Sequence, residues 1–459
     1  MSDIIMPNNW DPYPHQTGLW AYLNEGRLPN GRVAPGKRAV CCDHRRSGKD
    51  SCSLNIEATE AMRVTGSYYH FLPTLAQAKR VIWNAVDREE RRVLTQAFPK
   101  EIVKTTNKQD LLLELINGSM WQLGGSDNYN AFVGTNIMGI VFSEWSLCDP
   151  KAWEYFRPIL RENGGWAIFI YTMRGKNHGY DLLEMAKENP KWYAVKNTVE
   201  MTVRHDGTPI ISQDDIQEER DSGMSEEMIQ QEFYCSEEVE LPGAYFAKDL
   251  SKTREEKRIC HVPVIPTLPV YTFWDLGQSK GNAMTVWFVQ AYGKEKRIVN
   301  YIEKEDSDLG WFVLQVREFC KYHKCFLGEN FAPHDIEVRD LLNKKTRKKL
   351  VEEALDFHFT TVKRVGNKNE AIQAAHAIFP YCFFDSTRCM KGINGLASYR
   401  RKEDKHNPGK FIDEPLHDWA SNVADGFMTF AQGWNPRLEQ AGRQRNVQGK
   451  LRSDFEVFK

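Results

Sequence analysis

Several features that would assign a chain to a familiar class are missing from this sequence. Its ten cysteines form no C-x-x-C pair, which argues against a secreted fold held by disulfides and for a reducing compartment. The apolar runs are short, since residues 166–171 have the length of a buried strand and not of a membrane span. Residues 1–10 are polar and lack the apolar stretch and cleavage site of a signal peptide. We therefore expect a cytoplasmic protein with no membrane contact.

An excess of charge of either sign is also missing. The 61 basic and 62 acidic residues give a net charge of -1, so any contact with a polyanion must come from local patches. What is present is ample apolar material, 41% of the residues, in a chain of 459 residues. That length predicts two domains. The spacing Cys320-x-x-His323-x-Cys325 has no second pair of metal ligands, and a buried helical face is the preferred interpretation.

The first half of the chain alternates short β-rich runs with helical patterns. Such alternation predicts an α/β domain with a parallel sheet and helices on both faces. The segment 202–240 is charged and rich in helical patterns. The expected strands are 38–42, 68–72, 121–124, 139–143 and 167–171, and the expected helices are one from Asp50 and one over 75–86.

A different pattern begins at residue 270. Three strands separated by turn residues predict an antiparallel meander, and alternating helices and strands follow. This order is typical of a ribonuclease-H-like core. The expected elements are strands 270–276, 284–291, 297–303 and 325–330, and helices 310–322, 336–355, 369–378 and 417–432. The predicted boundaries are a first domain at 1–245, a linker at 246–268, a second domain at 269–435 and a basic, weakly ordered tail at 436–459.

The segment 44–50 (HRRSGKD) follows the first expected strand and precedes a helix. It is similar to a phosphate-binding loop, G-x-x-x-x-G-K-[ST], although Asp43 stands at the first glycine and Asp50 at the final hydroxyl position. In such a loop Lys49 would hold the β- and γ-phosphates, and Gly48 would let backbone N–H groups approach them. Asp50 or Ser51 would reach Mg²⁺. The loop predicts binding of ATP with Mg²⁺.

The strand expected at 139–143 ends in Ser143 and Glu144, where an ATPase of this kind has Asp-Glu. The hydroxyl and the carboxylate have therefore exchanged places between Asp50 and Ser143, so the metal site would keep one of each. Glu144 is expected to orient the attacking water. The alternatives are that Asp50 is a helix N-terminal acid and that Glu144 caps the strand. The expected ATP-binding residues are Gln16, Ser47, Gly48, Lys49, Asp50, Ser51 and Ser143.

Arginines are expected to stabilise the charge on the γ-phosphate. Arg45 and Arg46 lie inside the loop and would act within one subunit, whereas Arg157 or Arg161 would act across a subunit boundary. The sequence does not choose between them. Gln16 would place its amide, which is both donor and acceptor, against an adenine edge, or else lie on the surface.

The second half offers carboxylates for a metal-dependent phosphodiesterase. Asp275 interrupts an apolar strand, where a buried charge is costly unless it is paired or bound to metal. Asp335 follows a later strand and could instead cap a helix. Asp418 and Asp425 are seven residues apart on the last helix, which predicts one face. Together these four would hold two Mg²⁺ or Mn²⁺ ions, which stabilise the attacking and leaving oxygens of a phosphodiester.

Two basic runs flank these acids in the sequence. A charged run is often only a solvated face, but beside a phosphodiesterase site it predicts contact with the DNA backbone without base readout. The residues expected to bind DNA are Lys344, Lys345, Arg347, Lys348, Arg400 and Arg401.

Taken in order along residues 14–429, these motifs resemble the large subunit of tailed-bacteriophage terminases. The chain departs from that family at Asp50 and Ser143, at Met173, where proline is usual, and at Asn422, where histidine is common. The motifs that carry the resemblance are Pro14-His15-Gln16, the loop HRRSGKD, Leu72-Pro73-Thr74 with Gln77-Ala78, Gly125-Ser126-Asp127-Asn128, Glu144, Tyr171-Thr172-Met173-Arg174-Gly175-Lys176-Asn177-His178, Asp275, Pro333-His334-Asp335 and Ala424-Asp425-Gly426-Phe427.

The resemblance implies a P-loop ATPase motor domain at 1–245 and a nuclease domain at 269–435. It implies ATP-driven movement of double-stranded DNA into a procapsid and cutting of concatemeric DNA, with Thr172 in the motif that couples hydrolysis to movement. The implied partners are the portal protein, the small terminase subunit and further copies of the chain in a ring on the portal, in the host cytoplasm. Two other classes stay open: a helicase–nuclease of DNA repair, which would need a second motor domain, and a non-enzymatic DNA-binding scaffold with decayed sites.

Overall fold

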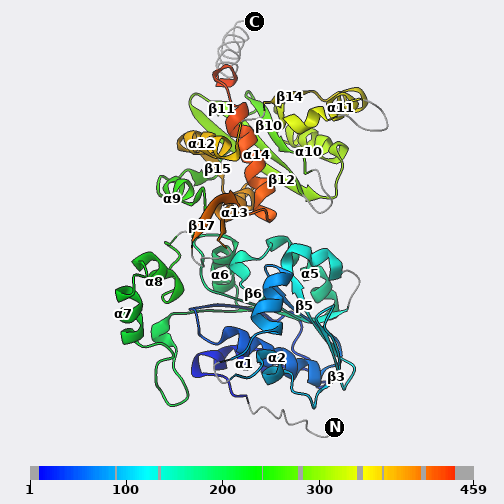
Figure 1. The fold of residues 1–459 in the computed structure, drawn as a ribbon. Coiled ribbons are helices and arrows are strands. Elements are labelled where there is room, and N and C mark those ends of the chain that lie inside the picture. The colour runs from blue at the N-terminus through cyan, green and yellow to red at the C-terminus, as the bar shows by residue number, and fades with distance from the viewer. Residues whose placement is uncertain are drawn as a thin grey trace, which may run out of the picture. The chain divides into compact units, whose positions relative to one another are not determined.

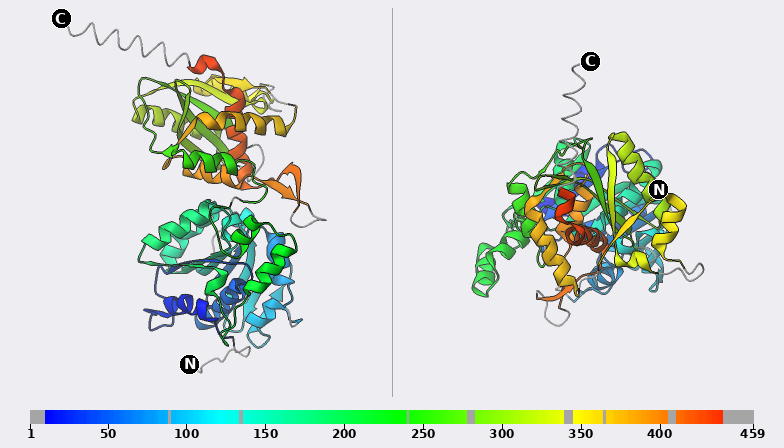
Figure 2. Two further views of the ribbon diagram at one scale, coloured as in Figure 1. Left: turned by 90° about the vertical axis from the view of Figure 1, so that its left-hand side faces the viewer. Right: turned by 90° about the horizontal axis from the view of Figure 1, so that it is seen from above.

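The structure is a computed structural model that describes residues 10–87, 90–132, 136–239, 241–277, 283–338, 345–363, 366–404 and 410–439. The chain divides into two compact units, Met1–Glu240 and Leu241–Lys459. Each unit is built on its own sheet (Figures 1 and 2). Within the described ranges, no helix combines the length and the apolar character needed to cross a membrane.

The described part of the first unit contains an eight-stranded sheet in the order β3-β4-β5-β2-β6-β7-β1-β8. The strands from β5 to β8 in this order are parallel, whereas β3 and β4 add an antiparallel edge. The bounds are β1 Arg38–Asp43, β2 Ser67–Leu72, β3 Val103–Asn107, β4 Leu112–Leu115, β5 Met120–Gly125, β6 Ile137–Ser143, β7 Trp166–Tyr171 and β8 Trp192–Asn197.

Helices cover both faces of this sheet, which explains why its central strands read as continuous apolar runs. On β1, Ala39 and Cys41 pack into the cluster that contains α2, while Val40 and Cys42 pack into the cluster that contains α5 and α6. Figure 1 shows α1 and α2 on one side of the sheet and α5 and α6 on the other. The helices are α1 Thr17–Asn24, α2 Lys49–Arg63, α3 Leu75–Ala78, α4 Val93–Ala97, α5 Pro150–Asn163, α6 His178–Glu188, α7 Gln213–Asp221 and α8 Glu226–Glu232.

The second unit contains, in its described residues, a seven-stranded sheet in the order β14-β13-β10-β11-β12-β15-β9. The strands β10, β11 and β12 form an antiparallel meander, and β13, β14, β15 and β9 add to it in parallel. The bounds are β9 Ile259–Cys260, β10 Pro269–Asp275, β11 Ala283–Tyr292, β12 Glu295–Glu305, β13 Phe326–Pro333, β14 Phe359–Val362 and β15 Cys382–Asp385, with a separate hairpin of β16 Arg401–Glu403 and β17 Phe411–Pro415.

Helices also cover both faces of this second sheet. Phe273 of β10 packs with α12 and α14, and its neighbour Trp274 packs with α10 and α11 on the opposite face. A three-strand meander followed by parallel strands and flanking helices confirms the ribonuclease-H-like class, and the parallel sheet before it confirms the α/β class of the first unit. The helices are α9 Ala247–Glu255, α10 Leu309–Tyr322, α11 Arg347–Leu355, α12 Lys368–Ile378, α13 Met390–Ser398 and α14 Trp419–Gly433.

The segment 246–268, predicted as a linker, belongs instead to the second unit. It contains α9 and β9, and β9 pairs with β15 of the second sheet. Phe246 and Leu250 of this segment are fully buried. Its prolines suggested a linker, but a two-residue edge strand leaves little pattern in a sequence. Of the predicted tail, residues 436–439 form a separate short helical segment after α14, with Leu438 buried, and the rest lies outside the described residues.

Candidate active sites

The loop 44–48 lies between β1 and α2, in the position of a phosphate-binding loop. Gly48 has φ of 83°, and a Cβ there would lie 3.3 Å from the amide nitrogen of Gln16. A left-handed backbone in such close contact favours glycine. Lys49, the first residue of α2, is buried with its ammonium among acidic groups. The N-terminus of α2 and this lysine together provide the positive field that a phosphate needs.

Asp50 and Ser143, the two residues that appear exchanged in the sequence, are in direct contact. The hydroxyl Oγ of Ser143 donates a hydrogen bond of 2.5 Å to Oδ1 of Asp50. Ser143 ends β6 and is fully buried, while Asp50 lies in the first turn of α2. Ser51, the other candidate hydroxyl, is exposed. One hydroxyl and one carboxylate therefore share a position beside Lys49, where a phosphate-bound cation needs oxygen ligands.

Glu144 lies at the end of β6, facing Lys49. Its carboxylate is 3.7 Å from the ammonium of Lys49, which also donates to Oγ1 of Thr172 at 3.2 Å. Glu144 has φ of 54°, an uncommon conformation for a residue with a side chain and one that clusters at functional sites. Among the described residues, its buried Oε2 has no hydrogen-bond partner. This oxygen has unused capacity to accept a hydrogen bond from a water molecule.

The charge on Lys49 is held by its surroundings. Burial alone would lower the pKa of Lys49, but Glu144, Asp50 and Asp43 more than offset it and raise the pKa above its usual value. Thr172, which the resemblance places in the coupling motif, donates to the backbone oxygen of Asp43 at 2.9 Å. The end of β7, the end of β1 and the start of α2 are thus joined through one hydroxyl.

Asp43 was noted in the sequence only as a departure from the usual loop, yet it is a buried acid of the site. Its Oδ1 accepts a hydrogen bond of 2.7 Å from the amide of Asn197 on β8. Burial raises the pKa of Asp43 to about 6, against the opposing effects of Asn197 and Lys49. The signal that could have revealed it is an acid at the end of an otherwise apolar strand.

The raised pKa of Asp43 predicts a pH effect on stability. A carboxyl group that is easier to protonate in the folded state stabilises the fold below its unfolded pKa near 4, and this contribution is lost as pH rises through about 6. Asp43→Asn should therefore gain stability relative to the parent protein between pH 4 and 7, by up to about 3 kcal/mol. Unfolding of both proteins in urea across this range measures the difference, and a difference independent of pH would contradict it.

The arginines of the loop take different positions. The backbone N–H of Arg45 donates to the backbone carbonyl of Glu232 at 2.7 Å, and the guanidinium of Arg45 lies 3.7 Å from the side-chain carboxylate of Glu232. Arg174 pairs with Glu232 as well. Arg46, in a left-handed conformation, and Arg45 line a cavity of about 570 Å³ next to α7 and α8. Arg157 and Arg161 are exposed, one turn apart on α5.

Gln16 does not present a free amide. Its Nε2 donates to the carbonyl of Ser47 at 3.2 Å, and its Oε1 accepts from the backbone N–H of Tyr13 at 3.1 Å. His15 also contacts the Ser47 carbonyl at 3.1 Å. As it stands, Gln16 supports the loop, and it would need to exchange partners to contact an adenine edge.

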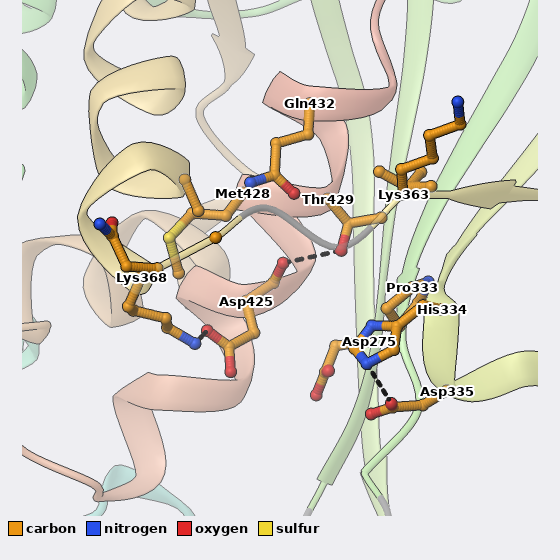
Figure 3. A pocket seen from close by; sticks show the side chains of 14 residues that line it. Asp275, Pro333, His334, Asp335, Lys363, Lys368, Asp425, Met428, Thr429 and Gln432 are labelled. Carbon is orange, nitrogen blue, oxygen red and sulfur yellow. Dashed lines mark hydrogen bonds and ion pairs between the residues drawn. The ribbon is translucent and has the colours of Figure 1, made fainter. Parts of the chain in front are cut away.

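In the second unit, Asp275, Asp335 and Asp425 line one cavity of about 330 Å³ (Figure 3). Asp275 ends β10, and Asp335 follows β13, its parallel neighbour. The carboxyl ends of parallel neighbours lie at the same edge of a sheet. Asp425 comes from α14, which packs against β10. The fold therefore brings together three of the four predicted metal ligands.

The three carboxylates face one cavity, and two of them are paired with basic side chains. Burial, followed by the charge of Asp425, raises the pKa of Asp275 to about 8, while Lys368 opposes the shift. Lys368 pairs with Asp425, and Nε2 of His334 lies 2.9 Å from Asp335. In the described ranges, no group of three His, Cys, Asp or Glu side chains is close enough together to hold one metal ion. Two of the carboxylates are turned toward Lys368 and His334 instead.

The residue types nevertheless fit a divalent cation. Carboxylate oxygens are the ligands that Mg²⁺ and Mn²⁺ prefer. The cavity has room for ions, and its acids are costly to bring together without a cation.

Asp418 does not line this cavity, so the structure does not bring this predicted metal ligand together with the other three. It is the N-cap of α14, and its carboxylate accepts from the backbone N–H of Ala420 at 3.0 Å and lies 3.4 Å from Arg400. An N-cap residue has a non-helical backbone, here with φ of -141°. Asp418 therefore lies just before the helix, whereas Asp425 lies within it.

The basic runs are largely paired within the chain. Lys345 pairs with Glu353 and Lys348 with Glu337, at 2.6 and 3.3 Å, near α11. Arg400 pairs with Asp418, as above. Arg401 pairs with Asp413 in the β16–β17 hairpin, which Figure 2 shows in orange, extending from the rest of the second unit. Arg347 begins α11, and Lys344 lies outside the described residues. Contact with DNA remains a prediction for this set.

Fold and sites together define a class: an α/β unit with a loop in the position of a phosphate-binding loop, followed by a ribonuclease-H-like unit with a carboxylate cavity. No family model matches the chain. It is 25% identical over 164 residues to the terminase large subunits of Thermus phage G20c and of Thermus virus P23-45. The match covers 32% of this chain and 33% of each relative.

The chain thus spans about a third of the length of the curated relatives it matches. Among solved structures, the large terminase of a thermophilic bacteriophage is 13% identical, over 92% of this chain and 99% of that one, with a TM-score of 0.39. The resemblance to terminase large subunits that the order of motifs indicates is confirmed by the two Thermus phage relatives.

Proposed function

We propose that this protein is the motor and nuclease of a phage DNA-packaging machine. The observation that carries the proposal is the presence in one chain of two different sites: Lys49, Asp50, Ser143 and Glu144 at a phosphate-binding loop, and three acids around one cavity. A helicase–nuclease would use its second half for another motor domain, whereas here that half is ribonuclease-H-like.

At the first site the protein hydrolyses ATP. Lys49 neutralises the β- and γ-phosphates, and Asp50 and Ser143 supply oxygen ligands to the Mg²⁺ that accompanies the nucleotide. Glu144 accepts a hydrogen bond from the attacking water and orients it. Arg45 or Arg46, or Arg157 or Arg161 from a neighbouring copy, stabilises the charge that develops on the γ-phosphate. Thr172 contacts both Lys49 and the end of β1, so it connects this chemistry to the sheet.

At the second site the protein cuts DNA. Asp275, Asp335 and Asp425 hold two Mg²⁺ or Mn²⁺ ions, which when bound supply stabilisation of the attacking and leaving oxygens. Because these acids lie at the edge of the sheet, the phosphodiester bond is cut at that edge. The basic residues near α11 and on the hairpin contact the DNA backbone. Concatemeric double-stranded DNA is the substrate in this proposal.

The proposed partners are those that the resemblance to terminase large subunits implies, and the name of the two relatives denotes one subunit of a larger enzyme. Several copies of the chain form a ring on a portal protein and work together with a small terminase subunit. It acts in the host cytoplasm and docks transiently on the procapsid.

One preparation tests the two activities together. The purified protein, supplied with portal protein and double-stranded DNA, should release phosphate from ATP and, with Mg²⁺ or Mn²⁺, nick plasmid DNA with a steep dependence on salt. A protein that does neither is a scaffold with decayed sites. A protein that unwinds duplex DNA processively is a helicase–nuclease.

The contact between Asp50 and Ser143 predicts coupled effects of substitution. Asp50→Ser alone should impair ATP hydrolysis, and adding Ser143→Asp should restore part of it, because neighbouring ligands of one ion couple by about 0.5–3 kcal/mol. Phosphate release by the parent, both single variants and the double variant gives the coupling. If the two losses simply add, the residues do not share an ion.

A further inference from the structure

Lys368 is a feature of the carboxylate cavity that the sequence analysis did not identify. It is the first residue of α12, directly after the N-cap Asn367, and its ammonium pairs with Asp425 of α14. Figure 3 shows its side chain reaching Asp425 at the cavity that Asp275 and Asp335 also line. The two residues lie 57 positions apart in the sequence, and their ion pair joins α12 to α14.

An ion pair as exposed as this one would ordinarily contribute little to the stability of the fold. The Lys368 side chain is 44% exposed and that of Asp425 is 29% exposed, and such pairs are worth about 0.2–1 kcal/mol. This pair differs in its surroundings, because two further carboxylates face the same cavity. The ammonium is therefore the counter-charge of an acidic cluster, in the place where a divalent cation would bind.

An ammonium and a divalent cation repel each other and compete for the same carboxylate. We infer that Lys368 is a positioning residue that holds Asp425 while the cavity contains no metal, and that a divalent ion must displace it from Asp425 in order to bind. The inference rests on the proposed nuclease function. In the absence of metal, Lys368 thus offsets the repulsion among the three carboxylates, and in its presence Lys368 weakens metal binding. Its long flexible side chain can move away from Asp425 without movement of the backbone.

The competition can be measured without any cleavage. Free Mn²⁺, followed by its electron paramagnetic resonance signal, is titrated with the full chain in the absence of nucleotide and DNA. Lys368→Gln should bind Mn²⁺ about two- to fivefold more tightly than the parent protein. Lys363→Gln is the matched control, because Lys363 lines the same cavity and, in the described part of the chain, no ion pair joins it to Asp425. It should change the affinity less than Lys368→Gln does.

Thermal unfolding gives the second readout. Without metal, Lys368→Gln should melt below the parent protein, because the three acids lose their counter-charge, and saturating Mn²⁺ should remove most of that difference. Lys368→Arg, which keeps the charge, should melt like the parent. An Mn²⁺ affinity of Lys368→Gln equal to or weaker than that of Lys363→Gln overturns the inference.

The failure of the nuclease proposal has a different signature. If Asp275→Asn binds as much Mn²⁺ as the parent protein, the ions do not bind at this cavity, and the proposed nuclease site fails together with the exchange at Lys368. If Asp275→Asn loses Mn²⁺ while Lys368→Gln gains nothing, the metal site stands and only the role of Lys368 is wrong.

Discussion

Glu144→Gln should reduce ATP turnover by about 100- to 10,000-fold, the range expected when a positioned catalytic base is removed. The amide keeps the size of the side chain but cannot carry the negative charge that draws a proton from water. The contact of 3.7 Å between Glu144 and Lys49 shows that the carboxylate reaches the region where Lys49 would hold the γ-phosphate. Because Lys49, Asp50 and Ser143 are unchanged in this variant, nucleotide binding should persist.

Two measurements separate these effects: phosphate release with portal protein and DNA present, and binding of a fluorescent ATP analogue to the protein alone. Glu162→Gln, a substitution near the exposed end of α5, is the control for a lost glutamate charge and should leave both unchanged. Lys49→Ala differs in kind, since it should lose nucleotide binding as well. If Glu144→Gln hydrolyses ATP within a few-fold of the parent protein, the water is oriented by another group.

The sequence predicted the parts of the fold whose patterns are strong. The strand before the loop, the strand that ends in Ser143 and the meander from β10 to β12 lie within a few residues of their predicted positions. These strands are buried on both faces or flanked by clear turn residues. The exposed edge strand β3 carries mostly polar residues, and its half-buried neighbour β4 is only four residues long, and both were missed. The short strand β9, hidden among prolines, was missed as well.

The same contrast holds within the sites. The relation between Asp50 and Ser143 was visible because each departs from a known motif, and they are in contact. Asp418 was expected inside the last helix, at 417–432, but it is the N-cap that precedes α14, a boundary that periodicity alone does not fix. Glu232 and Lys368 carry no motif, and their roles depend on contacts between elements far apart in the chain. Such contacts cannot be read from local pattern.

Asp275→Asn should abolish metal-dependent DNA cutting, with a loss of more than about 100-fold. The substitution keeps the shape of the side chain but removes the charge of an acid whose pKa of about 8 reflects burial and two acidic neighbours. Loss of a residue that hydrogen-bonds to a metal ligand typically costs about 10–100-fold in metal affinity or in activity. Loss of a ligand that the proposal places on the metal itself should exceed that.

Plasmid nicking with Mg²⁺ and with Mn²⁺ measures this effect, and ATP turnover of the same preparation serves as the internal control, since the proposed nucleotide site lies in the first unit. Asp356→Asn is the matched variant: Asp356 is 95% exposed and has φ of 48°, a conformation that asparagine tolerates well. It should nick DNA at the rate of the parent protein. If Asp275→Asn also nicks at that rate, the cavity between β10, β13 and α14 is not where DNA is cut, because the charge of a carboxylate that lines this cavity acts on any ion bound in it.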